Sequence, residues 1–494
     1  MNRATGLRAL QETAQWDVAI IGGGATGLGC ALDAALRGYR TVLLEQGDFA
    51  QATSSRSTKL VHGGVRYLRQ GNLPLVRSAL RERGHLLRNA PHLVHPLGFV
   101  IPAYSLWEKP YYAVGLKLYD SLAGSLGIAP SRTLSREETL ELIPGVAPKG
   151  LRGGILYQDA QFDDARLAIA LAQSFAKIGG VPLNYVRVCG LLKSQDKLCG
   201  VSAYDIESDT EFEVHARVVI NATGVFSDAV RELDERACRP MLTRSQGAHI
   251  VLDARFLPGN TALMIPRTED GRVLFAIPWQ GRVLVGTTDT PVDNAPLEPR
   301  AQPQEIAFLL SHAARYLAQA PAESDILSVF AGLRPLIKTG ADSPTAGLSR
   351  DHVVSVSASG LVSIGGGKWT TYRKMAEDAV TAAAQIGRLP TRASETASYA
   401  LEQSPILSAA PNEEEVRQAV RHEMARSLED MLARRSRALF LDARASLNCA
   451  PQVAQWMAAE LGRAPDWPAT QVTAFKALAA GYLPIESSAT PGSP

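Results

Sequence analysis

Three glycines near the N-terminus have the type and spacing that hold a phosphate anion. Gly22, Gly24 and Gly27 fit the pattern GxGxxG, between a short apolar run at 17–21 and a helix-like run that continues through 31–36. In such a turn the first glycine allows a tight bend, the second lets the backbone approach a pyrophosphate, and the third lets helix and strand pack closely. The positive end of the helix and its first N–H groups would then face the anion.

The next expected strand, at 40–44, ends at an acidic residue at a suitable distance for a ribose. The carboxylate of Glu45 can accept hydrogen bonds from both ribose hydroxyls, and its charge would repel a 2′-phosphate. We therefore predict a dinucleotide site at this strand–helix–strand unit. The alternative is a glycine-rich turn that binds no ligand.

Two segments far along the chain favour FAD over NAD. An apolar strand expected at 216–220 ends in the run 221–224, and a strand expected at 361–364 enters the glycine-rich run 365–368 and then a helix. A helix that points its positive end at a flavin stabilises the anionic reduced ring. Because three distant segments would build one extended site, we predict FAD as the cofactor.

The overall composition argues against several classes of protein. The chain has 494 residues, so two or three domains are expected, and its net charge of +2 provides no general field for nucleic acid. Its five cysteines form no CxxC pair and no metal-ligand spacing, which predicts a reducing compartment and no metal site. The sequence shows neither a secretory signal nor a run of about 18 apolar residues. We expect a cytoplasmic protein that does not span a membrane.

The order of the expected elements predicts an α/β fold. A helix at 163–177 leads to one strand at 181–188, while residues 247–289 alternate with period two, which indicates antiparallel strands. Beyond about residue 404 the pattern is helical.

These patterns divide the chain into three parts and a tail. The first 400 residues would hold a discontinuous Rossmann-like FAD-binding domain and, interleaved with it, an antiparallel-sheet substrate-binding domain. We place the FAD-binding domain at 16–96, 150–240 and 345–385, and the substrate-binding domain at 97–150 and 241–345. A C-terminal helical domain would follow at 401–485, with a flexible tail at 486–494.

At this point the sequence resembles a known family. Residues 53–68 (TSSRSTKLVHGGVRYL) look like the signature of FAD-dependent glycerol-3-phosphate dehydrogenases, within the wider amino-acid-oxidase-like flavoproteins. Later signatures are similar at 247–251, 286–289, 332–336, 349–351 and 366–374, and the run 421–435 resembles the family's helical domain. Arg56, Thr58 and Leu333 depart from the pattern without affecting an assigned role. The calcium-loop pattern of the mitochondrial members is absent, so the chain resembles the aerobic-type bacterial form.

The resemblance implies oxidation of sn-glycerol 3-phosphate to dihydroxyacetone phosphate, with hydride transfer to FAD and a quinone as electron acceptor. Three alternatives remain open from the sequence. The chain could be an oxidase that passes electrons from the same substrate to oxygen, or an amine or amino-acid oxidase of the same flavoprotein class. The third alternative, a non-enzymatic FAD-binding or tRNA-modifying scaffold, would not need several phosphate ligands.

Such a substrate requires cations for its phosphate and a base for its hydroxyl. Arginine suits the phosphate because its fork binds oxyanions in bidentate fashion, and histidine suits the base because its pKa lies near neutrality. The substrate-binding candidates are Arg66, Tyr67, Arg334, Arg350 and Lys368, and the catalytic candidates are His62, His249 and Arg334. For each arginine the alternative is a surface charge, and for each histidine a structural hydrogen bond.

The remaining candidates belong to the cofactor site. They lie in the glycine turn, in the segment resembling the family signature and at the ends of the later strands. The predicted cofactor-binding residues are Gly22, Gly23, Gly24, Gly27, Glu45, Gln46, Thr53, Ser54, Ser55, Lys59, His62, Gly63, Gly64, Val188, Ala222, Gly224, Thr287, Gly332, Gly367, Lys368 and Trp369. For the hydroxyl residues of the signature the alternative is a plain helix cap.

Electrons must also leave the reduced flavin, and residues 99–119 carry aromatic and lysine side chains that suit a membrane interface. They are Tyr104, Trp107, Tyr111, Tyr112 and Tyr119 with Lys109 and Lys117, preceded by Arg69, Arg77, Arg81, Arg83 and Arg88. This pattern predicts peripheral attachment to the inner membrane. With such attachment the acceptor would be a quinone, as the resemblance implies. The alternative is a buried helix with a solvated face. A homodimer is compatible with the sequence.

Overall fold

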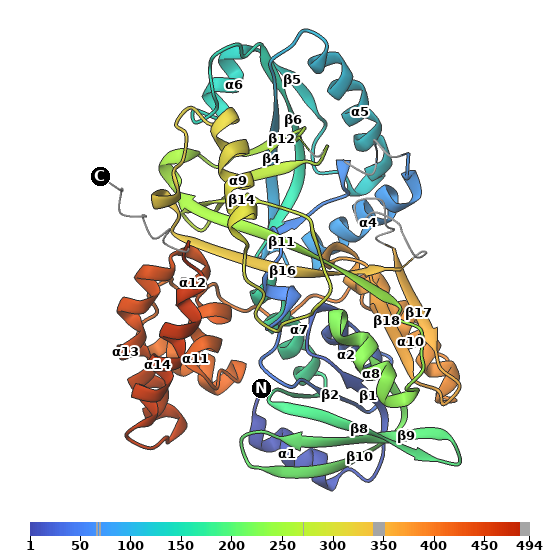
Figure 1. The fold of residues 1–494 in the computed structure, drawn as a ribbon. Coiled ribbons are helices and arrows are strands. Elements are labelled where there is room, and N and C mark those ends of the chain that lie inside the picture. Colours follow the sequence, from blue (N-terminus) through green and yellow to red (C-terminus); the bar gives the residue numbers. More distant parts are fainter. Residues whose placement is uncertain (66–67, 69–70, 270, 339–350, 485–494) are drawn as a thin grey trace.

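The structure is a computed structural model that describes all residues except 66–67, 69–70, 270, 339–350 and 485–494. It contains two large sheets with helices on their faces and a group of helices at the C-terminus (Figure 1). This architecture confirms the predicted α/β class, including its C-terminal helical part. The predicted tail, 486–494, lies outside the described residues.

The first sheet joins segments from both halves of the chain in the order β17-β18-β10-β1-β2-β7, with β8 and β9 paired beyond β10. Its strands are β1 (Trp16–Ile21), β2 (Thr41–Leu44), β7 (Val181–Leu183), β8 (Val186–Ser194), β9 (Lys197–Asp205), β10 (Thr210–Asn221), β17 (His352–Val356) and β18 (Val362–Gly366). Strands β18, β10, β1, β2 and β7 are parallel. Their carboxyl ends therefore meet at one edge, as the sequence predicts for its three distant segments.

Both faces of the parallel strands are buried, which explains their continuous apolar runs. One face packs on α2 (Ala25–Leu36), α7 (Asp164–Lys177) and α10 (Tyr372–Ile386). The other face packs on α1 (Arg3–Glu12) and on the β8–β9–β10 meander.

The single strand predicted at 181–188 is wrong, because the chain breaks between β7 and β8. Tyr185 has a left-handed backbone (φ 57°), and its N–H donates to the carbonyl of Gly47. The buried Asn184 beside it donates to Asp48 and to the carbonyl of Met424. The break thus places polar groups against the loop that follows β2.

The second sheet is largely antiparallel, with the order β15-β11-β14-β13-β12-β4-β6-β3, and β16 and β5 paired on β11 and β6. Its strands are β3 (Leu60–Val61), β4 (Val94–Ala103), β5 (Arg132–Leu134), β6 (Gly153–Phe162), β11 (Leu242–Asp253), β12 (Ala262–Ile265), β13 (Leu274–Trp279), β14 (Arg282–Gly286), β15 (Thr290–Val292) and β16 (Ser328–Ile337). Strand β6 pairs with β4 from Val94↔Phe162 to Ala103↔Gly153, so residues 153–162 lie in this sheet and not in the first one.

Helices α4, α5, α6 and α9 lie around the second sheet, α8 follows β10 and packs on the first sheet, and short 3-10 helices lie in the connections between elements. Their bounds are α4 (Leu73–Asn89), α5 (Glu108–Ala123), α6 (Arg136–Leu142), α8 (Ser227–Asp234) and α9 (Pro303–Tyr316). The short 3-10 helices are η1 (Thr53–Ser55), η2 (Gly124–Leu126), η3 (Gly224–Phe226), η4 (Ala254–Phe256), η5 (Glu323–Asp325) and η7 (Trp369–Thr371).

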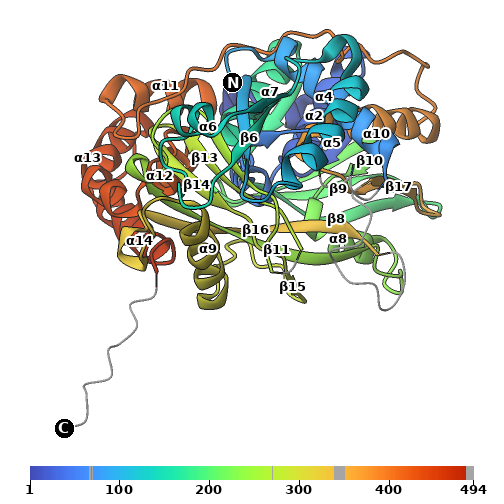
Figure 2. The ribbon, with the colours of Figure 1, turned by 90° about the horizontal axis from the view of Figure 1, so that it is seen from above.

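The C-terminal helical part, residues 413–484, lies at one end of the molecule, away from β17 and α10 (Figures 1 and 2). It consists of α11 (Glu413–Glu423), a π-helical turn (Asp430–Arg435), α12 (Ala438–Leu441), α13 (Ala443–Leu461) and α14 (Trp467–Ala480). Its apolar residues share one buried cluster with the second sheet, through contacts such as Phe440 on Phe330.

Candidate active site

A cavity of about 570 Å³ is lined by residues from both sheets. The first sheet contributes the carboxyl ends of β1, β10 and β18, with Gly22, Ala222 and Gly366 among the lining residues. The second sheet contributes His249 from β11 and Arg334 from β16. A crevice at the carboxyl ends of parallel strands is where open α/β sheets bind ligands.

The glycine turn brings the backbone close to the end of β10. Gly22 has a φ of 106°, and a Cβ there would lie 2.9 Å from the carbonyl oxygen of Ala222. Gly24 caps α2, and the next N–H, of Ala25, donates to Ser54 Oγ at 2.9 Å. A side chain at Gly22 would collide with the backbone at the end of β10, and Gly24 and Ala25 at the helix N-terminus line the cavity, so the turn fits a bound phosphate.

Glu45 lines the cavity and at the same time fixes the glycine turn. Its Oε2 accepts from the N–H of Gly23 at 2.6 Å, and its Oε1 accepts from the N–H of Gly47 at 2.8 Å. Burial raises the pKa of Glu45, while the hydrogen bonds from Gly47 and Gly23 oppose that rise. A second role of Glu45, as a ligand of the ribose, stays a prediction.

Residues 45–58, here called the cavity segment, form one wall of the cavity. The hydroxyl of Thr53 donates to the carbonyl of Leu333 on β16 at 2.7 Å, and the carbonyl of Ser54 accepts from Trp369 Nε1 at 2.8 Å. The cavity segment therefore connects the second sheet with the short helix that precedes α10.

Arg334 presents a guanidinium to the cavity that is held from behind by the loop after β14. Its Nη2 donates to Thr287 Oγ1 and to the carbonyl of Thr288, both at 2.9 Å. Its Nη1 lies 3.3 Å from the carbonyl of Gln246 and 3.4 Å from Asp289 Oδ1. These partners fix the orientation of the fork, and 19% of the side chain remains exposed.

His249 is buried beside Arg334, with its ring stacked on Phe330 at 4.9 Å. Its Nε2 lies 2.9 Å from Thr58 Oγ1, and its Nδ1 has no hydrogen-bond partner among the described residues. Burial lowers the pKa of His249 well below its ordinary value of 6.5, and the charges of Lys59 and Arg334 lower it further. The imidazole is therefore neutral at physiological pH and can accept a proton.

Most of the predicted site residues are brought together by the structure. Those that line the cavity are Gly22, Gly24, Glu45, Gln46, Thr53, Ser54, His62, Val188, Ala222, Gly224, His249, Gly332, Arg334, Gly367, Lys368 and Trp369. Gly23, Gly27, Ser55, Gly63 and Gly64 lie near these residues in sequence but do not line the cavity, and Thr287 does not line it either but accepts from Arg334. Arg66, Tyr67 and Arg350 lie outside the described residues.

The prediction that Lys59 binds the cofactor is not supported by its side chain. Lys59 is fully buried, and its Nζ donates to Asp164 at 2.6 Å and to the carbonyl of Ser55 at 2.8 Å. It does not line the cavity. Burial lowers the pKa of Lys59 to about 7, against the opposing charge of Asp164. The sequence could not separate this buried ion pair from a ligand contact, because Asp164 is 105 positions away.

Several residues that line the cavity are not among the predicted ones, and Thr58 and Gln51 are the two that matter most for its polar contacts. Thr58, which contacts His249, stands in the recognised signature but was treated only as a departure from it. Gln51 lines the cavity and donates to Glu429 at 3.4 Å. For Gln51 the sequence shows only that it follows the predicted ligand Gln46 by five residues, and this spacing does not indicate the direction of its side chain.

Comparison with known proteins places these features in a wider group. The sequence matches the profile of a family described as FAD dependent oxidoreductase over residues 17–373, and one described as the C-terminal domain of alpha-glycerophosphate oxidase over 363–468. It is 44% identical over 410 residues to the mitochondrial glycerol-3-phosphate dehydrogenase of Macaca fascicularis, and 43% identical over 410 residues to that of Homo sapiens. Each match covers 80% of this chain and 56% of the relative, so the chain spans little more than half the length of these relatives.

A solved structure shares the whole arrangement. The X-ray structure of the glycerol-3-phosphate dehydrogenase from Bacillus halodurans, complexed with FAD, is 28% identical in sequence and superposes with a TM-score of 0.79. The match covers 97% of this chain and 97% of that chain. The similarity therefore extends over both sheets and the C-terminal helical part.

Proposed function

Because this chain belongs to the FAD dependent oxidoreductase family, we propose that it oxidises sn-glycerol 3-phosphate to dihydroxyacetone phosphate. Membership of the family confirms FAD as the predicted cofactor. The main observation behind this substrate assignment is that the dinucleotide turn, Arg334 and His249 line one cavity. The relatives named glycerol-3-phosphate dehydrogenase support a phosphorylated alcohol as the substrate.

The residues at the first sheet fit the cofactor. Gly22, Gly24 and the first turn of α2 would hold the pyrophosphate, since they line the cavity and the helix presents its N-terminus there. Glu45 would bind the ribose, while Lys368 and Trp369 line the cavity near the start of α10 and would contact the ring end. When bound, FAD supplies the acceptor for the hydride from the substrate carbon.

The chain's own residues must bind the phosphate and take the hydroxyl proton. Arg334 has its fork fixed by Thr287 and Thr288, so it can bind an oxyanion without losing much side-chain entropy. His249 is held neutral and lines the cavity, with its Nε2 beside Thr58, so its imidazole is placed to take the hydroxyl proton. We assign His249 as the base and Arg334 as a ligand of the substrate's phosphate.

The test is reduction of the flavin without oxygen. The purified protein should be yellow, and glycerol 3-phosphate should bleach its flavin absorbance under argon. Bleaching by glycine or sarcosine, with none by glycerol 3-phosphate, would replace the proposal with an amine oxidase. The rate of reoxidation by a short-chain quinone against that by oxygen then separates a dehydrogenase from an oxidase.

A surface at α5 supports a quinone in a membrane as the electron acceptor. Apolar and aromatic side chains in and just before this helix are exposed by 45% to 83%: Leu106, Trp107, Tyr111, Val114 and Leu118. We call these five residues the α5 surface. Leu116 and Tyr119 on the same helix are buried, so the helix is anchored on one side and apolar on the other.

Only some of the arginines near the α5 surface are exposed enough to contact lipid headgroups. Arg77, Arg81 and Arg88 on α4 are exposed and could meet anionic headgroups. Arg83 is buried and paired with Asp159 at 2.7 Å, which corrects its predicted role at a membrane. In the part of the chain that the structure describes, no helix has both the length and the apolar character needed to cross a bilayer. We propose peripheral attachment at the inner face of the membrane through the α5 surface.

Vesicle binding tests this attachment. The double variant Trp107→Ser/Val114→Ser should bind vesicles containing anionic lipid about tenfold or more weakly, because it removes two large apolar groups from the α5 surface. The matched control is Val356→Ser, at an exposed apolar residue of β17. Equal binding by all three proteins would exclude the α5 surface as the contact.

A further inference from the structure

The cavity segment is contacted on its far side by the C-terminal helical part. Its own secondary structure is limited to the short helix Thr53–Ser55, so its conformation depends on the groups around it. Four of its residues are bound by side chains from the C-terminal helical part: Asp48, Gln51, Ser55 and Arg56. Three of these residues, Asp48, Ser55 and Arg56, are buried.

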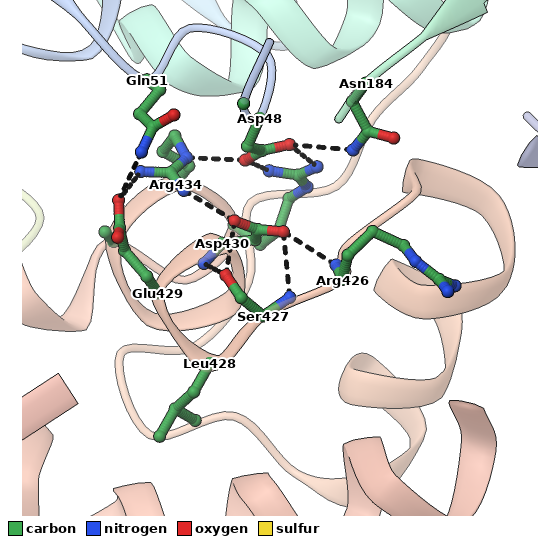
Figure 3. Close-up of polar contacts among 12 residues, drawn as sticks. Asp48, Gln51, Asn184, Arg426, Ser427, Leu428, Glu429, Asp430 and Arg434 are labelled. Atoms are coloured by element: carbon green, nitrogen blue, oxygen red, sulfur yellow. Dashed lines mark hydrogen bonds and ion pairs between the residues drawn. The ribbon is translucent and has the colours of Figure 1, made fainter. Parts of the chain in front are cut away.

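The strongest of these contacts is at Asp48. Its carboxylate accepts from Arg434 Nε at 2.6 Å and from both terminal nitrogens of Arg435, at 2.6 and 2.9 Å. Asn184 adds a longer contact at 3.4 Å (Figure 3). Both arginines come from the π-helical turn Asp430–Arg435, and both are nine-tenths or more buried. A buried carboxylate with two guanidinium partners fixes the position of the loop that carries it.

Arg434 also connects this pair to the cavity wall. Its Nη1 donates to Glu429 at 2.6 Å, and Glu429 accepts from Gln51, which lines the cavity (Figure 3). The same guanidinium donates to Asp430 at 2.7 Å. Arg434 therefore binds the buried carboxylate of Asp48 directly and is linked, through Glu429, to the cavity-lining Gln51.

Two further contacts hold the other end of the cavity segment. Arg437 Nη2 donates to the carbonyl of Ser55 at 2.9 Å. Arg56 donates to the hydroxyl of Tyr482 at 2.9 Å, beyond the end of α14. The C-terminal helical part thus binds the cavity segment from residue 48 to residue 56.

We propose that the C-terminal helical part is a clamp for the cofactor, in which Arg434, Arg435 and Arg437 are positioning residues for the wall that receives FAD. This proposal rests on FAD as the cofactor and does not depend on which substrate is oxidised. It has a reciprocal consequence. If docking of the helices strengthens FAD binding, FAD must strengthen docking by the same factor.

A second docking contact of the same helices provides the matched control. Glu207, on the turn between β9 and β10, accepts from Arg426 at 2.6 and 2.7 Å and from Arg463 at 2.6 Å. Glu207 does not line the cavity, and neither does its turn. Glu207→Gln therefore weakens the docking of the C-terminal helical part without touching the cavity segment.

The experiment compares Arg434→Met with Glu207→Gln. FAD is removed from each purified full-length protein and titrated back, with quenching of flavin fluorescence as the signal. We expect Arg434→Met to weaken FAD binding about tenfold, as for other coupled sites, and Arg434→Lys to restore part of it. Glu207→Gln should lower the melting temperature of the protein but change FAD affinity less than about twofold. Equal effects of the two variants on FAD affinity, or no effect of Arg434→Met, would overturn the clamp.

Two readouts cover the case in which Arg434→Met does not fold. Tyr482→Phe removes the hydroxyl that accepts from Arg56 and donates to Glu298, while the ion pair between Arg56 and Glu298 stays. The variant should still weaken FAD binding by a few-fold, since two hydrogen bonds at the end of the cavity segment are lost. In the wild type, FAD should slow hydrogen exchange in residues 430–437 as well as in residues 45–58. Protection by FAD that is confined to 45–58 would contradict the clamp.

Discussion

The arginine at the cavity and the arginines of the C-terminal helical part differ in how far their charge is neutralised by the protein. Arg334 is held mainly by hydroxyl and carbonyl oxygens, and part of its surface is exposed to the cavity. Arg434 and Arg435 are fully surrounded and bind carboxylates, above all Asp48. The first arrangement orients a cation that has one carboxylate partner, Asp289, and still reaches the cavity, while the second neutralises its cations within the protein.

The difference separates catalytic from positioning chemistry. Near Arg334 the structure keeps His249 neutral and close to the same cavity, so the polar groups there are prepared for a substrate. At Asp48 every charge has a partner, and what the cluster provides is the shape of the cavity segment. Substitutions in the first region should therefore change turnover, and substitutions in the second should change stability and cofactor affinity.

The largest effect is expected at His249. The substitution His249→Gln removes the proton acceptor, so kcat/KM for glycerol 3-phosphate should fall by about a hundredfold to ten-thousandfold. The variant should still bind FAD. Because the pKa of His249 is lowered from 6.5, protonation requires a lower pH, and the acid limb of the wild-type kcat/KM profile should lie below pH 6.5. Steady-state kinetics from pH 5 upward in one-unit steps measure both effects. A larger loss in His62→Gln would instead identify His62 as the base.

The second largest loss of activity is expected for Arg334→Ala. It removes the oriented guanidinium beside the substrate, and we expect a loss of about a hundredfold to a thousandfold in kcat/KM through both kcat and KM. The absorbance spectrum of the bound flavin should not change. Loss of the yellow colour in this variant would mean that Arg334 belongs with the structural arginines, and the contrast between the two regions would fail.

Asp48→Asn probes the second region through stability. It leaves Arg434 and Arg435 buried with a neutral partner, which should lower the free energy of unfolding by about 3–5 kcal/mol. Urea unfolding followed by circular dichroism measures this change. The control is Glu413→Gln, which breaks the exposed pair with Arg417 and should cost about 0.5 kcal/mol or less. Similar costs for the two variants would show that the buried cluster contributes no more than a surface pair.

Local patterns made much of this molecule predictable. The glycine turn, the strand ends at Ala222 and Gly367 and the alternation in β11–β14 depend on neighbouring residues, so the fold class and the segments that meet at the cavity could be predicted from the sequence. Helix α4 also begins and ends where its amphipathic pattern does, from Leu73 to Asn89.

The contacts that the sequence did not predict join residues that lie far apart in the chain. Arg434 meets Asp48 across 386 positions, and Thr58 meets His249 across 191. No periodicity records such pairs, so the buried role of Lys59 and the contribution of Gln51 were hidden. The break at Tyr185 was missed for the same reason, because its hydrogen bond to Gly47 is a tertiary contact.

The smallest of the expected effects is at Glu45 and tests the link between the two regions. The sequence predicts that this carboxylate binds the ribose, whereas in the structure its oxygens accept from the N–H groups of Gly23 and Gly47. Glu45→Ala should weaken FAD binding about tenfold, because the turn loses two charged hydrogen bonds. Glu45→Gln separates the two roles in the same flavin-fluorescence titration. Its amide keeps one acceptor for the turn, so affinity near the wild-type value would mean that Glu45 acts by shaping the turn. A loss as large as in Glu45→Ala would mean that the negative charge itself is needed, as expected for a ligand that accepts from both ribose hydroxyls.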